Sequence, residues 1–225
     1  MIITTETTLQ NTGPTFSKSL RAVAVFISYV FHPLFIPLYI AYYIAFINTG
    51  FFAGQPVLIK YYVLIWVFVN MFFFPALSVL LLKAVGFIDT VYLRTKKDRI
   101  IPYIAANLFY FWMFLVFHNH LQIPLIVTSF VLGVFITSSL ALIANIYFKI
   151  SMHAMGMGGA IGVMLVILFY TPYSTGISLP LMVVLILSGM VCSSRLICSD
   201  HTPKEIYSGL ILGILFQIIA AKIIL

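Results

Sequence analysis

Apolar residues fill long, almost uninterrupted segments of this chain, and short polar stretches separate them. Each segment is close to the roughly 20 residues that a helix needs to cross a hydrocarbon core of ~30 Å. The segments are apolar on every side, whereas the strands of a membrane barrel alternate, so we expect helices. Seven such segments are predicted, over residues 21–47, 58–82, 101–117, 123–148, 155–171, 179–194 and 206–225.

Composition supports this interpretation, because 63% of the residues are hydrophobic and only 8% are charged. Soluble domains carry about 25% charged residues, so a soluble globule is excluded and an integral membrane protein is indicated. We expect an all-α fold, a polytopic transmembrane helix bundle of six to seven spans forming one domain over residues 21–225. Residues 1–20 form a polar N-terminal arm, and no small-residue cleavage site precedes the first helix, which we expect to be retained.

The 12 Lys and Arg residues are distributed unevenly over the predicted loops. All except Lys60 and Lys222 fall on one side of the bundle, together with the N-terminal arm. By the positive-inside rule this basic face is cytoplasmic, in a protein that we place in a bacterial inner (plasma) membrane. A re-entrant turn at residues 32–37 would reverse this orientation, and His32 has no assigned role.

Candidate chemistry lies in the polar stretch over residues 193–209, between the last two predicted spans. Ionisable groups at such a boundary are costly unless they pair or bind something, so they suggest a functional site. Arg195 is a natural anion ligand, and His201 is a natural nucleophile or base. Glu205, four residues after His201, shares its helix face and is positioned to hold the imidazole in one tautomer.

Structural roles are open for the same residues. Thr202, Pro203 and Glu205 have the pattern of an N-cap, a proline at the first helical position and a capping-box acid, which start a helix. Arg195 alone is also typical of an interfacial Arg whose charged head reaches water. Asp200 is an alternative partner for the neighbouring histidine.

Two further polar segments belong to the same face. Ser151 and His153 follow the fourth predicted span, and Lys96 and Arg99 follow the second, while the stretch over residues 193–209 follows the sixth. An even number of crossings separates each pair, so all three segments lie on one side of the membrane whichever way the chain is inserted. We therefore expect them to form one site.

The stretch over residues 193–209 resembles the third motif of the type 2 phosphatidic acid phosphatase superfamily. The pattern is Ser-Arg, five residues, His, three residues, an acid, and Gly four further on. Glu205 stands where the family has Asp. The matching residues are Ser194, Arg195, His201, Pro203 and Gly209.

The other two segments are similar to the remaining motifs of that family. Ile-Ser-Met-His-Ala, residues 150–154, resembles the second motif, Pro-Ser-Gly-His-Ala. The first motif, Lys, six residues, Arg-Pro, has its best candidate over residues 94–103, where two residues separate Arg99 from Pro102 and Tyr92 replaces the Lys.

The resemblance implies a membrane enzyme that hydrolyses a lipid phosphate or a polyprenyl diphosphate. His201 would be the nucleophile, His153 the acid and then the base, and Glu205 the residue that orients His201. Phosphate ligands would be Arg195, Arg99, Lys96 and Ser151.

The sequence also leads to expectations about metals, cofactors, partners and alternative functions. No metal ligand set accompanies these residues, so no metal and no cofactor are expected. The expected partners are a lipid phosphate substrate and membrane lipids, with no nucleic acid. Phosphotransfer to an alcohol is an alternative within the same chemistry. From another class, the alternative is a non-enzymatic lipid-phosphate-binding or transport protein with a degenerate site, which the replacement of a family Gly by Met152 supports.

Overall fold

The computed structural model describes residues 16–91, 96–170, 176–198 and 201–225, and the regular elements in these ranges are all helices. The side chains of Lys96 and Lys97 are not described, and Asp200 and Tyr92 lie outside the described ranges. Most of the expected N-terminal arm also lies outside them.

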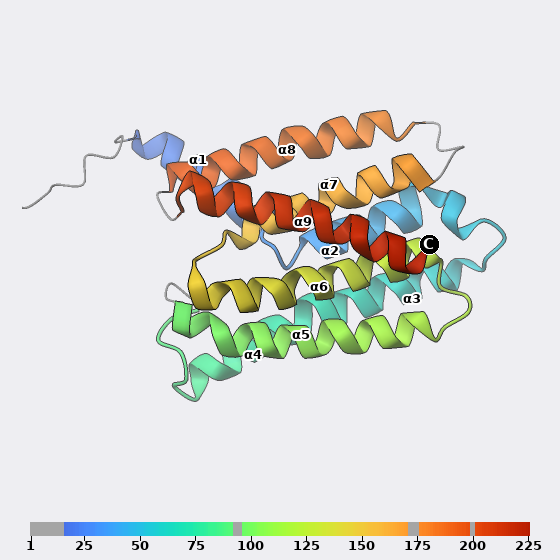
Figure 1. Ribbon diagram of the computed structural model, residues 1–225, viewed down its shortest axis with the longest axis horizontal. Coiled ribbons are helices and arrows are strands. Elements are labelled where there is room, and N and C mark those ends of the chain that lie inside the picture. Colours follow the sequence, from blue (N-terminus) through green and yellow to red (C-terminus); the bar gives the residue numbers. More distant parts are fainter. Residues whose placement is uncertain (1–15, 92–95, 171–175, 199–200) are drawn as a thin grey trace, which may run out of the picture.

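Six helices in the described ranges are long and apolar enough to cross a membrane. They pack side by side as one bundle (Figure 1), so the chain is an all-α integral membrane protein with several spans. The first, Val57–Ala84, joins α3 (Val57–Val67), the π-helical turn η3 (Phe68–Phe73) and α4 (Phe74–Ala84). The others are α5 (Lys96–His118), α6 (Leu125–Tyr147), α7 (Met152–Tyr170), α8 (Ser178–Ile197) and α9 (Pro203–Ile224).

The predicted first span over residues 21–47 is wrong as one continuous helix. The chain forms α1 (Lys18–Val30), an irregular stretch, α2 (Ile36–Tyr42) and the π-helical turn η1 (Tyr43–Ile47), and the short 3₁₀ helix η2 (Thr49–Phe52) follows. Pro33 explains the break, because proline lacks a backbone N–H and disfavours helical geometry at the residue before it. The break turns the end of α1 toward the bundle and places His32 in a loop.

The helices α7 and α9 approach each other closely through glycines. A Cβ atom on Gly209 of α9 would lie 2.7 Å from the carbonyl oxygen of Ser151, and one on Gly213 would overlap the backbone of Met155 and Gly159. In lipid, where apolar burial gives little drive for association, small residues of this kind let helix backbones pack together. This contact fixes the start of α7 beside the start of α9.

The starts of α5, α7 and α9 and the end of α8 lie at one end of the bundle, next to α1 (Figure 1). The three polar segments thus lie at one end of the bundle, in agreement with the even number of predicted crossings between them. The turn between α5 and α6 and the C-terminus lie at the opposite end.

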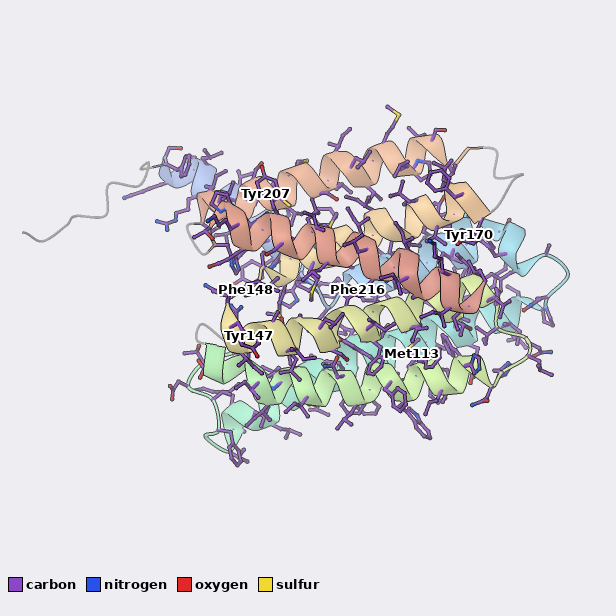
Figure 2. The ribbon with its side chains drawn as sticks, viewed as in Figure 1. Met113, Tyr147, Phe148, Tyr170, Tyr207 and Phe216 are labelled. Atoms are coloured by element: carbon purple, nitrogen blue, oxygen red, sulfur yellow. The ribbon has the colours of Figure 1, made fainter. Side chains whose placement is uncertain are left out.

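Aromatic side chains mark both ends of the bundle. Figure 2 shows Tyr147, Phe148 and Tyr207 near the end that carries the polar segments, and Tyr170 near the other end. All four are exposed, whereas Met113 is fully buried between helices. Tyr residues at these positions are typical of the interfacial belts of membrane proteins.

Candidate active site

The end of α1 connects two of the predicted site residues through Ser28. The last carbonyl groups of a helix have no partner within it, so they are free to accept from other segments. Nε2 of His153 lies 3.0 Å from the carbonyl oxygen of Ser28, and Nη1 of Arg195 donates to its hydroxyl across 3.3 Å. Because a carbonyl oxygen only accepts, Nε2 of His153 carries the proton of this hydrogen bond. Ser28 thus joins α1, α7 and α8 at one point.

The start of α9 holds His201 and Glu205 together. Thr202 is the N-cap, with its hydroxyl accepting from the backbone N–H of Glu205 across 3.4 Å, and Pro203 is the first helical residue. The N-cap and the proline at the first helical position are thus confirmed, while the capping-box role of Glu205 stays a prediction. Oε2 of Glu205 also lies 2.7 Å from Nδ1 of His201, so one short segment both starts the helix and orients the imidazole.

This contact determines which nitrogen of His201 is available for chemistry. An ionised carboxylate only accepts hydrogen bonds, so Nδ1 of His201 donates and Nε2 of the neutral ring keeps its lone pair. The imidazole is 4% exposed, which excludes most water from it. The geometry therefore leaves the lone pair of Nε2 unused by Glu205, in a side chain that is largely buried.

Burial lowers the pKa of His201 below its ordinary value of 6.5. The hydrogen bond that His201 donates to Glu205 opposes this shift, while the positive charges of Lys149 and Arg195 add to it. Burial and the two cations both disfavour the imidazolium ion. His201 is therefore a neutral imidazole at neutral pH, the state in which Nε2 can attack.

His153 lies within electrostatic reach of Arg195, His32 and His201. Its ring meets the ring of His32 edge-on, with centroids 5.4 Å apart and planes at 84°. His32 and Ser28 are site residues that the sequence analysis did not assign. Pro33 directly after His32 was the available signal, because a broken helix leaves backbone groups and a loop side chain to be used elsewhere.

Two other predicted phosphate ligands contact the backbone beside the histidines. Arg99 is 6% exposed, and its Nη1 donates to the carbonyl oxygen of Ile150 across 3.4 Å. Ser151 is fully buried, and its hydroxyl accepts from the backbone N–H of Ala154 across 3.5 Å at the start of α7. These contacts give both residues a structural role, and their role toward phosphate stays a prediction. The prediction for Lys96 concerns a side chain outside the described part of the structure.

The structure thus brings Arg195, His153, His201 and Glu205 together, with Arg99 and Ser151 in the adjoining wall. Within the part of the chain that the structure describes, no three His, Cys, Asp or Glu residues gather in a way that could hold a metal ion.

An apolar groove of about 350 Å³ lies between α1 and α8, the two helices that carry Ser28 and Arg195. Neither of these two residues lines the groove. Its lining residues are Leu20, Val23, Ala24, Ile27, Gly189, Met190, Ser193, Ser194 and Ile197, which are mostly apolar.

Comparison of the chain with protein-family models, with curated proteins and with solved structures finds no match. The fold itself defines the class of the molecule as an α-helical integral membrane protein with several spans.

Proposed function

We propose that this protein is a membrane-embedded phosphatase that hydrolyses a lipid phosphate or a polyprenyl diphosphate through a phosphohistidine, without a metal ion. The observation that carries the proposal is the 2.7 Å contact between Glu205 and Nδ1 of His201, in a site that also contains His153 and Arg195. An oriented, neutral histidine beside a guanidinium group suits nucleophilic attack on an anionic phosphoryl group.

In the first step Nε2 of His201 attacks phosphorus, a P–N bond forms and the P–O bond to the leaving group breaks. His153, as an imidazolium, gives a proton to the departing oxygen. The charge of a bound phosphoryl group would stabilise that imidazolium. Nε2–H of His153 is held by Ser28, so Nδ1 is the nitrogen that exchanges the catalytic proton.

In the second step water attacks the phosphohistidine, His153 takes a proton from that water, and the P–N bond breaks. Inorganic phosphate leaves and both histidines return to their starting states. Arg195 supplies the fixed positive charge throughout, since its guanidinium presents several donors to phosphoryl oxygens. The starts of α7 and α9 add their N-terminal dipoles, which favour an anion.

A lipid substrate fits this site better than a soluble phosphate ester. The site lies at the ends of membrane-spanning helices, where a lipid headgroup meets water. The groove between α1 and α8, the helices that carry Ser28 and Arg195, is lined mainly by apolar side chains, which suits a hydrocarbon tail. A tail in this groove would leave the phosphate beside the histidines.

The proposed location is a bacterial inner membrane with the site on the cytoplasmic side, as the basic face indicates. Cysteines introduced singly next to Lys97 and at Asn119 test this orientation, since these positions lie at opposite ends of α5. An impermeant thiol reagent applied to intact cells should label the cysteine at Asn119 and leave the other unlabelled. The reverse pattern would place the site outside.

The proposed activity is tested by phosphate release from a panel of lipid phosphates in EDTA, with the purified protein in detergent or lipid discs. Release should persist in EDTA and be inhibited by vanadate, which mimics the five-coordinate transition state. Binding of lipid phosphate without turnover of any panel member would instead favour the non-enzymatic lipid-phosphate-binding protein.

A further inference from the structure

We infer that His32, in the break between α1 and α2, is a third histidine of the site and donates a hydrogen bond to a phosphoryl oxygen of the substrate. This inference rests on the proposed function. It adds a phosphate ligand from the N-terminal segment, a part of the chain that lies outside all three polar motifs.

The backbone around His32 determines which nitrogen donates. The backbone N–H of Leu34 donates to Nδ1 of His32 across 3.4 Å, so Nδ1 keeps its lone pair and Nε2 of the neutral ring carries the proton. Burial and the charge of Arg195 both lower the pKa of His32, which favours this neutral form. His32 therefore offers one N–H donor, at Nε2.

The position of His32 relative to the other site residues is set by packing. Its ring lies edge-on against His153, and the charge of Arg195 acts on both rings. The loop itself packs against α7, where a Cβ on Gly156 would be 3.7 Å from Cα of Pro33. A phosphoryl group held by Arg195 next to His153 would therefore also lie next to His32.

Two substitutions separate a phosphate donor from a packing residue. His32→Ala removes the donor, and His32→Gln keeps an N–H donor at a similar distance from the backbone. His118→Ala is the matched control, because His118 ends α5 at the opposite end of the bundle. All three are made in the full chain and compared with wild type for vanadate affinity, by vanadate-induced thermal stabilisation, and for kcat and KM on a lipid phosphate.

For His32→Ala we expect vanadate affinity and kcat/KM to fall by about 10- to 100-fold, the usual effect of one hydrogen bond to a charged group. His32→Gln should recover at least part of this loss, and His118→Ala should match wild type. Wild-type vanadate affinity in His32→Ala would overturn the inference and leave the proposed function standing. A wild-type protein that neither binds vanadate nor releases phosphate would overturn both, and equal loss in the Ala and Gln variants would show a packing role instead.

Discussion

The backbone N–H of Ser151 donates to the carbonyl oxygen of Glu205 across 3.1 Å, and the carboxylate of the same Glu205 holds His201. One residue at the start of α9 thus connects the segment that carries His153 to the imidazole of His201. Gly209 allows this contact, because any side chain there would meet the carbonyl oxygen of Ser151. The relative position of the two histidines therefore depends on the backbone contact between α7 and α9.

Substitution of Glu205 separates its orienting role from its role at the helix start. Thr202 caps α9 through the backbone N–H of Glu205, so Glu205→Gln should leave stability nearly unchanged. We expect it to lower kcat by ~100-fold, by analogy with other histidine-orienting carboxylates, because an amide holds the imidazole less strongly. Glu205→Asp should stay active, since it keeps a carboxylate. Phosphate release and a melting curve for each variant measure the two effects.

Asp200→Asn is the control for this assignment, because Asp200 neighbours His201 in the sequence. We expect a change in activity of only a few-fold. An inactive Asp200→Asn together with an active Glu205→Gln would show that Asp200 is the orienting carboxylate.

Replacement of His201 by Ala should abolish phosphate release, because it removes the atom that attacks phosphorus. His201 precedes the N-cap Thr202, and Thr202 and Pro203 start α9 without its side chain, so the fold should persist. Size-exclusion elution and melting temperature check the fold, and a phosphate assay checks activity. Residual activity above about a tenth of wild type would contradict a covalent route through this residue.

The pH dependence of kcat/KM should report the lowered pKa of His201. Only the neutral ring attacks, so the acid limb of the profile falls as the pH drops through this pKa, and loss of the proton from the acid His153 sets the alkaline limb. Because the folded-state pKa lies below 6.5, the acid limb should lie below that pH. Lys149→Gln removes a charge that lowers the pKa, so it should move the limb to higher pH.

Glu205→Gln should move the same limb to lower pH, since the hydrogen bond that His201 donates to the Glu205 carboxylate raises the pKa of His201. Measurement of kcat/KM against pH in both variants checks the pair of opposite shifts. Shifts in the same direction, or no shift in either, would show that another group controls the profile.

Much of this architecture was predictable from residue patterns alone. Apolar segments of about 20 residues determine membrane helices because the hydrocarbon core accepts little else. The even number of crossings then places Arg99, His153 and His201 on one face without any detail of packing. The helix start at Thr202 and Pro203 was equally predictable from the sequence, because capping is a local interaction.

The contribution of α1 was not predictable in the same way. The sequence placed residues 21–47 in one span, whereas the chain breaks at Pro33 and brings Ser28 and His32 to the site. A proline near a helix can kink it or end it, and the outcome depends on what packs against the broken end. Here the carbonyl oxygen of Ser28 accepts a hydrogen bond from His153. The two residues are 125 positions apart in the sequence, so no local pattern predicts this contact.

The α7–α9 contact makes a prediction about stability. Gly213→Ala would place a Cβ against the backbone of Met155 and Gly159, which cannot rotate away, so the helices must separate. We expect the free energy of unfolding to fall by about 1–3 kcal/mol, as for overpacked cores, and activity to fall because the two histidines move apart.

Gly189→Ala in α8 is the control for Gly213→Ala, since nothing lies within 4 Å of its added Cβ. It should be neutral or stabilise by about 0.5–1 kcal/mol, the usual gain for Gly to Ala in a helix. Equal melting temperatures for the two variants would contradict the close contact.

The groove between α1 and α8 predicts a dependence on tail length. Gly189→Phe would fill part of the groove without touching the histidines, because Gly189 lines it two turns before Arg195. We expect KM for a long-chain lipid phosphate to rise about tenfold, the effect of losing roughly 1.4 kcal/mol of apolar contact. The kcat for a short-chain, water-soluble phosphate ester should stay at the wild-type value.

Ile186→Phe is the matched control for this variant, since Ile186 lies on the same helix and its side chain is 62% exposed on the outer surface. It adds a similar bulk outside the groove and should leave both substrates unaffected. If Gly189→Phe and Ile186→Phe raise KM equally, the effect arises from the surrounding lipid and the tail binds elsewhere. If only Gly189→Phe raises KM, and only for long chains, the substrate enters with its tail between α1 and α8. That outcome would make α1 a part of substrate recognition as well as the source of the Ser28 contact.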